Sequence, residues 1–191
     1  MIKRLNINKF KLLVVKIISL LLFSFISFQA YSQTSIYVLK AVYLEKFSRF
    51  VTWPEECNMD NPEKPFVISV IGKTPLYKNL EQIYSMQKIN NKKVVIKKIN
   101  NIYEIENSHI LVIAESERKN LQNILALTEK LPVLTVSESP NFGKEGVLIN
   151  FFEEKNKLKF EVNETAVIKS PLQMSFYLMN SAKIVKPVND N

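Results

Sequence analysis

The sequence predicts an α/β protein: a three-layer α/β/α sandwich with a mostly parallel sheet of five to six strands and an antiparallel hairpin near the C-terminus. Short runs rich in Val and Ile alternate with segments of helical spacing between residues 66 and 136. These runs are apolar throughout, which is typical of strands covered by helices on both faces. Two later runs flank a polar connection at residues 153–156, which is short enough for an antiparallel hairpin.

The N-terminal segment has the pattern of a secretory signal peptide. Residues 1–16 carry five basic side chains and no acidic one, and residues 17–28 form an apolar run. Ala30 and Ser32 place small residues at the −3 and −1 positions of a cut before Gln33. An uncleaved membrane anchor is the alternative, but the run is shorter than the roughly 20 residues of a membrane span. We therefore predict a signal peptide over residues 1–32, a periplasmic location, and a single mature domain over residues 33–191.

The first predicted element of that domain is an amphipathic helix over residues 36–51. Apolar side chains recur there at the i, i+3, i+4, i+7 spacing of one buried helix face. Pro54 ends the helix, because a proline disfavours the helical conformation in the residue before it. The predicted buried face consists of Ile36, Leu39, Val42, Tyr43, Phe47 and Phe50, and the predicted exposed residues are Lys40, Glu45, Lys46 and Arg49.

The rest of the chain alternates between strand and helix signals. β-branched runs bounded by glycine, proline and polar residues indicate strands, and leucine and isoleucine at helical spacing indicate helices. Strands are predicted at residues 66–71, 93–99, 109–113 and 133–136, helices at 75–86 and 116–131, a turn or short helix around Tyr103, hairpin strands at 147–152 and 157–162, and a final helix at 171–185.

The chain loses most of its basic excess with the predicted leader. The full chain has 26 basic and 18 acidic residues, a net charge of +8. Because the leader holds five basic residues and no acidic one, residues 33–191 carry 21 basic and 18 acidic residues, a net charge of +3. Lysines and glutamates are interleaved, so no basic stripe exists to neutralise a row of phosphates. We therefore expect no nucleic-acid binding.

Side chains that commonly carry catalysis are scarce. The predicted mature chain has one histidine, His109, one cysteine, Cys57, two aspartates, Asp60 and Asp190, and three glycines. His109 begins the most apolar strand, where a hydrogen-bonded structural role is expected rather than a catalytic one. The chain has no G-x-S-x-G elbow, no glycine-rich phosphate loop and no set of four zinc ligands. We expect no enzyme activity, no cofactor and no metal.

The single cysteine limits disulfide chemistry. Cys57 has no partner in the chain, so it cannot form an intrachain bridge. It is either a lone thiol in a loop or half of a bridge between two chains, which leaves a homodimer open. The core must then be stable without disulfides, and a chain of about 160 residues is long enough to bury about 70% of its extended surface.

The carboxyl ends of the predicted strands form a candidate ligand site, because open parallel sheets bind ligands there. Hydroxyl groups and helix starts at these ends favour a small anion. The alternative role of the hydroxyls is helix capping by Thr74, Ser116 and Ser139. Asn150, a polar residue in an apolar run, is either hydrogen bonded within its strand or part of a pocket. The predicted ligand rim consists of Gly72, Lys73, Ser116, Ser137, Glu138 and Asn150.

Three stretches of the sequence form a recognisable set. Residues 40–54 read KAVYLEKFSRFVTWP, residues 110–125 contain a Ser-Glu pair followed by leucine four residues later, and residues 132–151 read PVLTVSESPNFGKEGVLINF. In order and spacing they resemble the YfiR family of periplasmic regulators, whose opening is K-A-x-[YF]-L-x-K-F-x-x-F-V-x-W-P. The agreement extends over about residues 36–185.

The resemblance implies an α/β/α sandwich without catalysis that acts in cyclic-di-GMP signalling. The better-understood members restrain an inner-membrane diguanylate cyclase by binding its periplasmic portion. An OmpA-like outer-membrane lipoprotein relieves that restraint by sequestering the regulator. For this chain the resemblance therefore implies a protein partner, namely the periplasmic part of a membrane cyclase or sensor kinase. It also implies an OmpA-like lipoprotein as a second partner.

Two departures from the family bear on the partner. Some members have paired cysteines, whereas Cys57 stands alone. The family's C-terminal I-S-S-K-L-L segment has Tyr177 in place of its lysine here, beside a bulky Phe176. Partner binding is predicted at the exposed side of the first helix, in the loop around Phe142 and near the C-terminus, through Lys46, Arg49, Phe142 and Tyr177.

Two other functions stay open at this point. One is a periplasmic sensor that binds a nucleotide or another anion at the predicted rim. The other is a hydrolase without a cofactor, which would need a glutamate and a hydroxyl group in one cleft.

Overall fold

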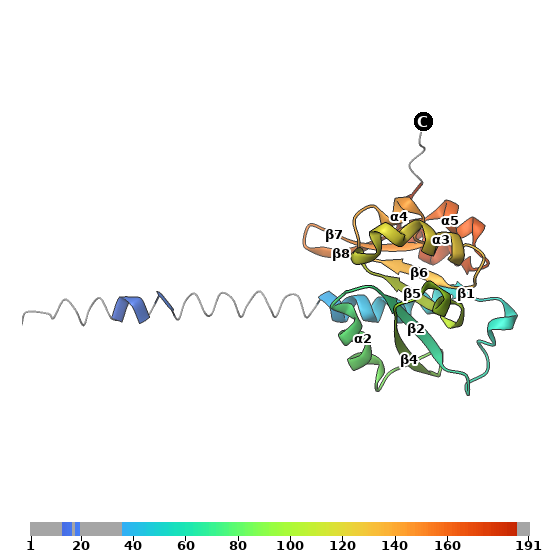
Figure 1. Ribbon diagram of the computed structural model, residues 1–191, viewed down its shortest axis with the longest axis horizontal. Helices are drawn as coiled ribbons and strands as arrows, with labels where there is room; N and C mark the ends of the chain where they lie inside the picture. Colours follow the sequence, from blue (N-terminus) through green and yellow to red (C-terminus); the bar gives the residue numbers. More distant parts are fainter. Residues whose placement is uncertain (1–12, 17, 20–35, 187–191) are drawn as a thin grey trace, which may run out of the picture. The chain divides into compact units, whose positions relative to one another are not determined.

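The computed structural model describes residues 13–16, 18–19 and 36–186 (Figure 1). Contacts within the chain divide it into two units, Met1–Tyr37 and Val38–Asn191. Within the first unit, residues 13–16 and 18–19 are helical and exposed. The rest of the predicted signal peptide and its cleavage site lie outside the described residues. No helix in the described part of the chain is long and apolar enough to pass through a membrane.

The second unit is built on a mixed sheet of eight strands. Their order across the sheet is β10 (Lys183–Val185), β8 (Lys157–Asn163), β7 (Ile149–Glu154), β6 (Leu134–Ser137), β5 (Ile110–Ile113), β2 (Phe66–Ile71), β4 (Lys92–Ile99) and β3 (Lys88–Ile89). The strands β7, β6, β5, β2 and β4 pair in parallel, as do β10 and β8. Two neighbouring pairs, β7 with β8 and β3 with β4, are antiparallel.

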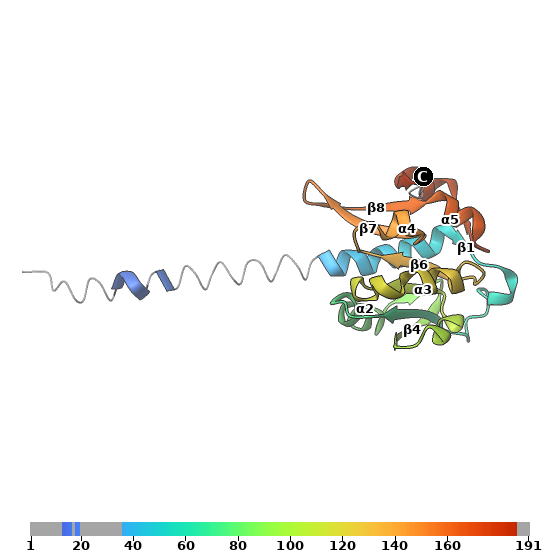
Figure 2. The same ribbon diagram turned by 45° about the horizontal axis from the view of Figure 1, so that its top comes forward.

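The sheet confirms the predicted α/β class and corrects the predicted strand number. All six predicted strands are present, and β3 and β10 are additional. These two contain only two and three residues, which is too short to produce a sequence signal. The predicted hairpin is β7 and β8, joined by Lys155 and Asn156 with φ values of 52° and 59°. Positive φ at both positions is the type I′ geometry that matches strand twist, and the hairpin projects beyond its neighbours (Figure 2).

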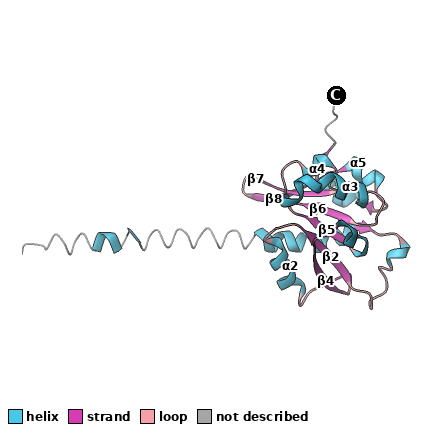
Figure 3. Ribbon diagram, viewed as in Figure 1, coloured by secondary structure: helices cyan, strands magenta, loops and turns pink. Residues whose placement is uncertain are grey.

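One face of the sheet is covered by α3 (Leu121–Thr128) and α4 (Phe142–Glu145). Ile71 of β2 and Ile113 of β5 share a buried cluster with Leu121 and Ile124 of α3 and with Phe142 of α4. Strand side chains point alternately to opposite faces, so the intervening residues of β2 and β5 face the other layer. Helices therefore flank the strands on both sides, as the predicted sandwich requires (Figure 3).

The opposite face carries the N-terminal helix, residues 36–50, and α2 (Leu76–Tyr84). The ring of Phe47 lies 5.5 Å from that of Phe151 in β7 and 5.0 Å from that of Phe160 in β8. The Tyr84 hydroxyl of α2 donates a 2.8 Å hydrogen bond to the Ala41 carbonyl oxygen. This contact joins the two helices of the layer.

The buried face of the N-terminal helix differs from the predicted one. Leu39 and Phe50 are 42% and 40% exposed, whereas Ala41 and Leu44 are fully buried. The buried stripe also includes Lys40, which was expected on the polar side. Lys40 can lie on this face because it has an acidic partner, Glu138, which the spacing of apolar residues cannot reveal.

The predicted single helix over residues 171–185 is wrong. That segment forms β9 (Gln173–Met174), α6 (Phe176–Ser181) and β10, and it follows a separate helix, α5 (Glu164–Lys169). The Ser175 hydroxyl accepts a hydrogen bond from the Leu178 N–H, so α6 begins with a side-chain cap. β9 pairs antiparallel with β1 (Val51–Thr52), which follows the N-terminal helix directly.

The remaining elements connect these layers. Helix α3 is preceded by a 3₁₀ segment, so the predicted helix over residues 116–131 has two parts. The turn predicted around Tyr103 is a 3₁₀ helix that begins with a capping box formed by Asn101 and Glu104. The 3₁₀ segments are η1 (Glu55–Cys57), η2 (Ile102–Asn107) and η3 (Glu115–Asn120).

Candidate functional site

The carboxyl ends of β2 and β5 lie side by side, as predicted. Their polar groups are hydrogen bonded to each other and so are not available to a ligand. The Lys73 N–H donates to Ser116 Oγ at 2.8 Å. Gly72 has a φ of +88°, and a Cβ atom there would lie 2.5 Å from Ser116 Oγ. The loop therefore needs glycine both for its backbone conformation and for the close approach of the hydroxyl. These three residues hold two loops together.

Glu138, at the end of β6, is the centre of a second cluster. Its Oε2 accepts from Lys40 Nζ at 2.5 Å, and its Oε1 accepts from the Thr74 hydroxyl at 2.7 Å. Lys40 and Glu138 expose only 9% and 17% of their side chains. The ion pair thus joins the N-terminal helix, the β2–α2 loop and the end of β6.

Ser137 ties two strands together instead of facing a ligand. Its buried hydroxyl donates to the Ile113 carbonyl oxygen at 2.9 Å and accepts from the Ser139 N–H at 3.2 Å. The helix-capping alternative fits Thr74, whose Oγ1 accepts from the Leu76 N–H at the start of α2. It does not fit Ser116, whose Oγ accepts from the Lys73 N–H instead, or Ser139, because no backbone N–H at the start of α4 donates to a side chain.

Asn150 is both hydrogen bonded within the sheet and part of a pocket. Its Nδ2 donates to Glu161 Oε1 at 3.0 Å, and the two residues are direct register partners in β7 and β8. Both are buried. Gly143 of α4 lies directly over them, since a Cβ there would be 2.5 Å from Glu161 Oε1.

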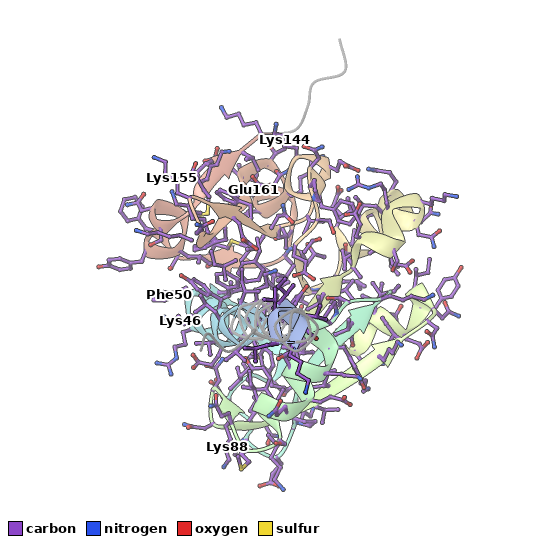
Figure 4. All side chains as sticks on the ribbon, turned by 90° about the vertical axis from the view of Figure 1, so that its left-hand side faces the viewer. Lys46, Phe50, Lys88, Lys144, Lys155 and Glu161 are labelled. Carbon is purple, nitrogen blue, oxygen red and sulfur yellow. The ribbon has the colours of Figure 1, made fainter. Side chains whose placement is uncertain are left out.

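A pocket of about 400 Å³ lies between these two polar clusters. Of the predicted rim, Glu138 and Asn150 line it, whereas Gly72, Lys73, Ser116 and Ser137 do not. Figure 4 shows Lys144 and Glu161 on the same side of the molecule. The charged or amide side chains that the structure brings together around the pocket include Lys40, Glu138, Lys144, Asn150, Glu161 and Lys183.

His109 has the structural role predicted for it. Its Nδ1 accepts a 3.0 Å hydrogen bond from the Val67 N–H, and its ring stacks 4.7 Å from that of Phe66. Burial, assisted by the positive charge of Lys92, lowers the pKa of His109 from 6.5 to about 4. The imidazole is therefore neutral near pH 7, and its acceptor nitrogen is occupied.

Three of the four predicted partner residues share one region of the surface. The β1–β9 pairing places the end of the N-terminal helix beside α6, and the Ser175 N–H donates to the Phe50 carbonyl oxygen at 2.8 Å. Phe176 and Tyr177 of α6 are 73% and 75% exposed, and Phe50 is 40% exposed. We call Phe50, Phe176 and Tyr177 the aromatic surface.

Basic residues of the N-terminal helix accompany the aromatic surface. Lys46 and Phe50 lie together on one side of this helix (Figure 4). Lys46 Nζ lies 5.4 Å from the centre of the Tyr43 ring, and Arg49 pairs with Glu45 at 2.5 Å. The fourth predicted partner residue is corrected, because Phe142 is fully buried and its ring lies under Arg118.

The family model described as YfiR/HmsC-like matches residues 37–183. The chain belongs to the YfiR/HmsC-like family. The match covers most of the second unit and agrees with the resemblance carried by the sequence motifs. None of the curated proteins matches the chain.

The acidic residue at the centre of the second cluster is hydrogen bonded within the protein. Both oxygens of Glu138 are occupied, one by Lys40 and one by Thr74, so the nearby hydroxyl is held as a donor to this carboxylate. A hydrolase of the predicted kind would need the glutamate to accept the proton of an attacking hydroxyl. Within the described ranges, no three His, Cys, Asp or Glu side chains form a group suited to a metal.

Cys57 of this YfiR/HmsC-like chain is a half-buried thiol in η1. Burial, together with the neighbouring Glu56 carboxylate, raises the pKa of the Cys57 thiol. A raised pKa keeps the sulfur in its unreactive thiol form near neutral pH. The local environment thus favours the lone-thiol interpretation.

Five charged residues of the pocket were missed by sequence reasoning: Lys40, Lys144, Glu153, Glu161 and Lys183. Glu161 did give a usable signal. Because residues of an antiparallel pair face the same side as their register partners, the polar Asn150 predicts a polar residue opposite it on β8. Lys40 gave no such signal, because its partner Glu138 lies 98 positions away.

Proposed function

We propose that the protein is a non-enzymatic periplasmic regulator that binds the periplasmic part of an inner-membrane signalling protein. The target is a diguanylate cyclase or a sensor kinase, and binding restrains its activity. An OmpA-like lipoprotein would relieve the restraint by competing for the same regulator. Membership of the YfiR/HmsC-like family supports the regulatory role, and the pattern of the first 32 residues supports export.

The aromatic surface is the observation that carries the proposal. Large aromatic side chains on the outside of a domain have no role in its own core, and they are the residues that dominate binding energy at protein interfaces. Phe176 and Tyr177 expose about three quarters of their surface, although they sit at the start of a capped helix that fixes their direction. Their exposure is therefore built into the fold.

Basic residues suit the edge of such an interface. Arg49 is exposed beside Phe50. Arginine is enriched in protein interfaces, where its guanidinium group can donate two parallel hydrogen bonds to one carboxylate. Lys46 is exposed on the same helix. An acidic rim on the partner would complement both charges and would speed association.

The internal bonding of the strand ends favours this function over an anion sensor. The backbone N–H of Lys73 and the hydroxyls of Ser116 and Ser137 are all hydrogen bonded within the protein. The pocket next to them is lined by three lysines and three glutamates, so its lining has no net positive charge to attract an anion. At Lys73, Ser116 and Ser137, a nucleotide phosphate would therefore find no open backbone N–H or hydroxyl donor.

Capture from membranes tests the proposal. The purified protein is immobilised, incubated with detergent-solubilised membranes of its host, and the bound proteins are identified by mass spectrometry. We expect enrichment of an inner-membrane protein with a periplasmic region, and at least a tenfold loss of capture for the variant with Phe176→Ser and Tyr177→Ser. Tyr103→Ser is the matched control, because Tyr103 is also 75% exposed but lies in η2.

Two results would contradict the proposal. One is equal capture by the wild type and by the double variant, which would remove the aromatic surface from the interaction. The other is the absence of any enriched membrane protein. The predicted location is checked separately, since export requires the protein in the periplasmic fraction to begin at Gln33.

A further inference from the structure

The base of the 400 Å³ pocket holds polar atoms that the protein leaves without partners. Asn150 is 2% exposed, and its Oδ1 has no hydrogen-bond donor within the described residues. Its Nδ2 is fixed on Glu161, so turning the amide over would lose that bond and place two nitrogen-bound hydrogens where the acceptor now lies. The unfilled acceptor is therefore a property of the packing.

Glu161 is the second unusual group. It is 8% exposed, it receives one hydrogen bond, and no lysine or arginine among the described residues pairs with it within 4 Å. Buried carboxylates are normally paired with a cation or with several donors, because removing the charge from water is costly. The Asn150–Glu161 pair thus presents acceptor atoms that lack donors.

A neighbouring pocket shows that this is not a general feature of the fold. It has a volume of about 370 Å³ and is lined by Thr135 and Asn163, among others. Thr135 Oγ1 accepts from the Leu148 N–H, and Asn163 bonds through both of its side-chain polar atoms, to the Gly143 carbonyl and the Ala166 N–H. Neither has an unpaired buried atom. The protein satisfies its own buried polar groups there.

The charges around the 400 Å³ pocket decide the class of ligand. Three lysines and three glutamates line it, namely Lys40, Lys144, Lys183, Glu138, Glu153 and Glu161. The lining charges therefore cancel, and neither a strong anion nor a strong cation is favoured. Hydroxyl groups both donate and accept, so they match buried acceptors at the base and lysine donors in the same wall. Phe151, Phe152 and Leu158 add apolar surface for carbon-bound hydrogens.

We propose that this pocket binds a neutral polyhydroxylated ligand, a saccharide of one or two units. Glu161 and Asn150 Oδ1 accept hydrogen bonds from its hydroxyls, directly or through one bound water. Lys144 and Lys183 donate to its oxygens. The site is separate from the aromatic surface, so the saccharide would act alongside partner binding rather than replace it.

An NMR titration of the isotopically labelled protein tests this site. The probes are glucose, N-acetylglucosamine and cellobiose, with inorganic phosphate and putrescine as charged comparisons. We expect at least one saccharide to shift the Asn150 side-chain amide and the Gly143 backbone amide, and the charged probes to shift neither. Glu161→Gln should weaken that binding at least tenfold, whereas Glu129→Gln, in the neighbouring pocket, should leave it unchanged.

The same experiment can overturn the proposal. No shift at Asn150 with any saccharide would exclude the site, and a shift with phosphate or putrescine alone would exclude the ligand class. Unchanged saccharide binding by Glu161→Gln would place the ligand elsewhere. The signals of the distant His109 report whether each variant is folded, so loss of binding is separated from loss of structure. Because the aromatic surface takes no part, the result is independent of the membrane-capture experiment.

Discussion

The two ends of the central sheet use polar side chains in opposite ways. At the amino ends of β5 and β2, His109 is the most reactive type of side chain in the unit, yet its ring is stacked and its acceptor nitrogen is occupied. Beside the carboxyl end of β6, Asn150 and Glu161 are ordinary residue types, yet Asn150 Oδ1 is buried without a donor and Glu161 receives a single hydrogen bond.

The contrast between His109 and the Asn150–Glu161 pair shows that the chemical reactivity of a residue type is a poor guide to its function in this chain. A buried histidine whose acceptor nitrogen is hydrogen bonded contributes to stability, because its neutral form is the one that the fold accommodates. An amide and a carboxylate that are incompletely bonded mark a place where something else can bind. The aromatic surface is a third case, in which exposure rather than chemistry carries the signal.

The largest expected change in stability comes from Lys40→Met, which removes the ion pair between Lys40 and Glu138 at the carboxyl ends of the strands. Removing the ammonium leaves the Glu138 carboxylate buried without its cation, which should lower the free energy of unfolding by about 3 kcal/mol. Urea unfolding measures this change. The double variant with Glu138→Gln should recover part of the loss. Arg49→Ala is the control, since its pair with Glu45 is exposed and should contribute less than about 0.5 kcal/mol.

At the amino ends of the strands, lowering the pH should destabilise the fold by protonating His109. Unfolded His109 binds a proton near pH 6.5, whereas folded His109 does so only near pH 4. The unfolded state therefore binds more protons in this window, so the stability contributed by the neutral ring is complete above pH 6.5 and is lost as the pH falls toward 4. The loss should reach up to about 3 kcal/mol.

Comparison with His109→Asn isolates this histidine from the carboxylates that titrate in the same range. Asparagine retains an acceptor for the Val67 N–H but does not titrate. The wild type should lose more stability than the variant between about pH 7 and about pH 4.5, as measured by urea unfolding. Parallel pH profiles for the two proteins would mean that the ring titrates normally in the fold.

A smaller loss of stability is expected from Gly143→Ala, which tests how closely α4 packs on the Asn150–Glu161 pair. A methyl group there meets Glu161 Oε1, so Gly143→Ala should cost about 1–3 kcal/mol through overpacking. Adding Glu161→Ala removes the clashing carboxylate, and the two changes should therefore be strongly non-additive in a double-mutant cycle. Simple additivity would show that α4 does not press on the Asn150–Glu161 pair.

The sequence allowed the strands to be predicted because each is a local run. A run of Val and Ile between Pro65 and Gly72 defines β2, and the apolar run of residues 110–113 defines β5, without reference to the rest of the chain. The hairpin of β7 and β8 was equally local. The two short edge strands were not predictable, since a strand of three residues such as Lys183–Val185 exists only through its pairing with β8.

The features that failed depend on distant partners. The C-terminal segment was predicted as one helix from its apolar spacing, but pairing with β1 makes Gln173–Met174 extended and moves the helix start to Phe176. Lys40 was assigned to the polar side because its partner, Glu138, is far away in sequence. Of the candidate site, Glu138 and Asn150 were found from strand ends and polarity. Glu161 could have been found as the hairpin partner of Asn150, whereas Lys40 required the structure.

Site-specific photo-crosslinking in living cells tests the central claim, that this chain acts through its aromatic surface, most directly. A photoreactive phenylalanine analogue is placed at position 177 in one strain and at position 103 in another, two sites with equal side-chain exposure. We predict that position 177 alone crosslinks to an inner-membrane signalling protein. Equal crosslinking from both positions, or a membrane partner reached only from position 103, would contradict it.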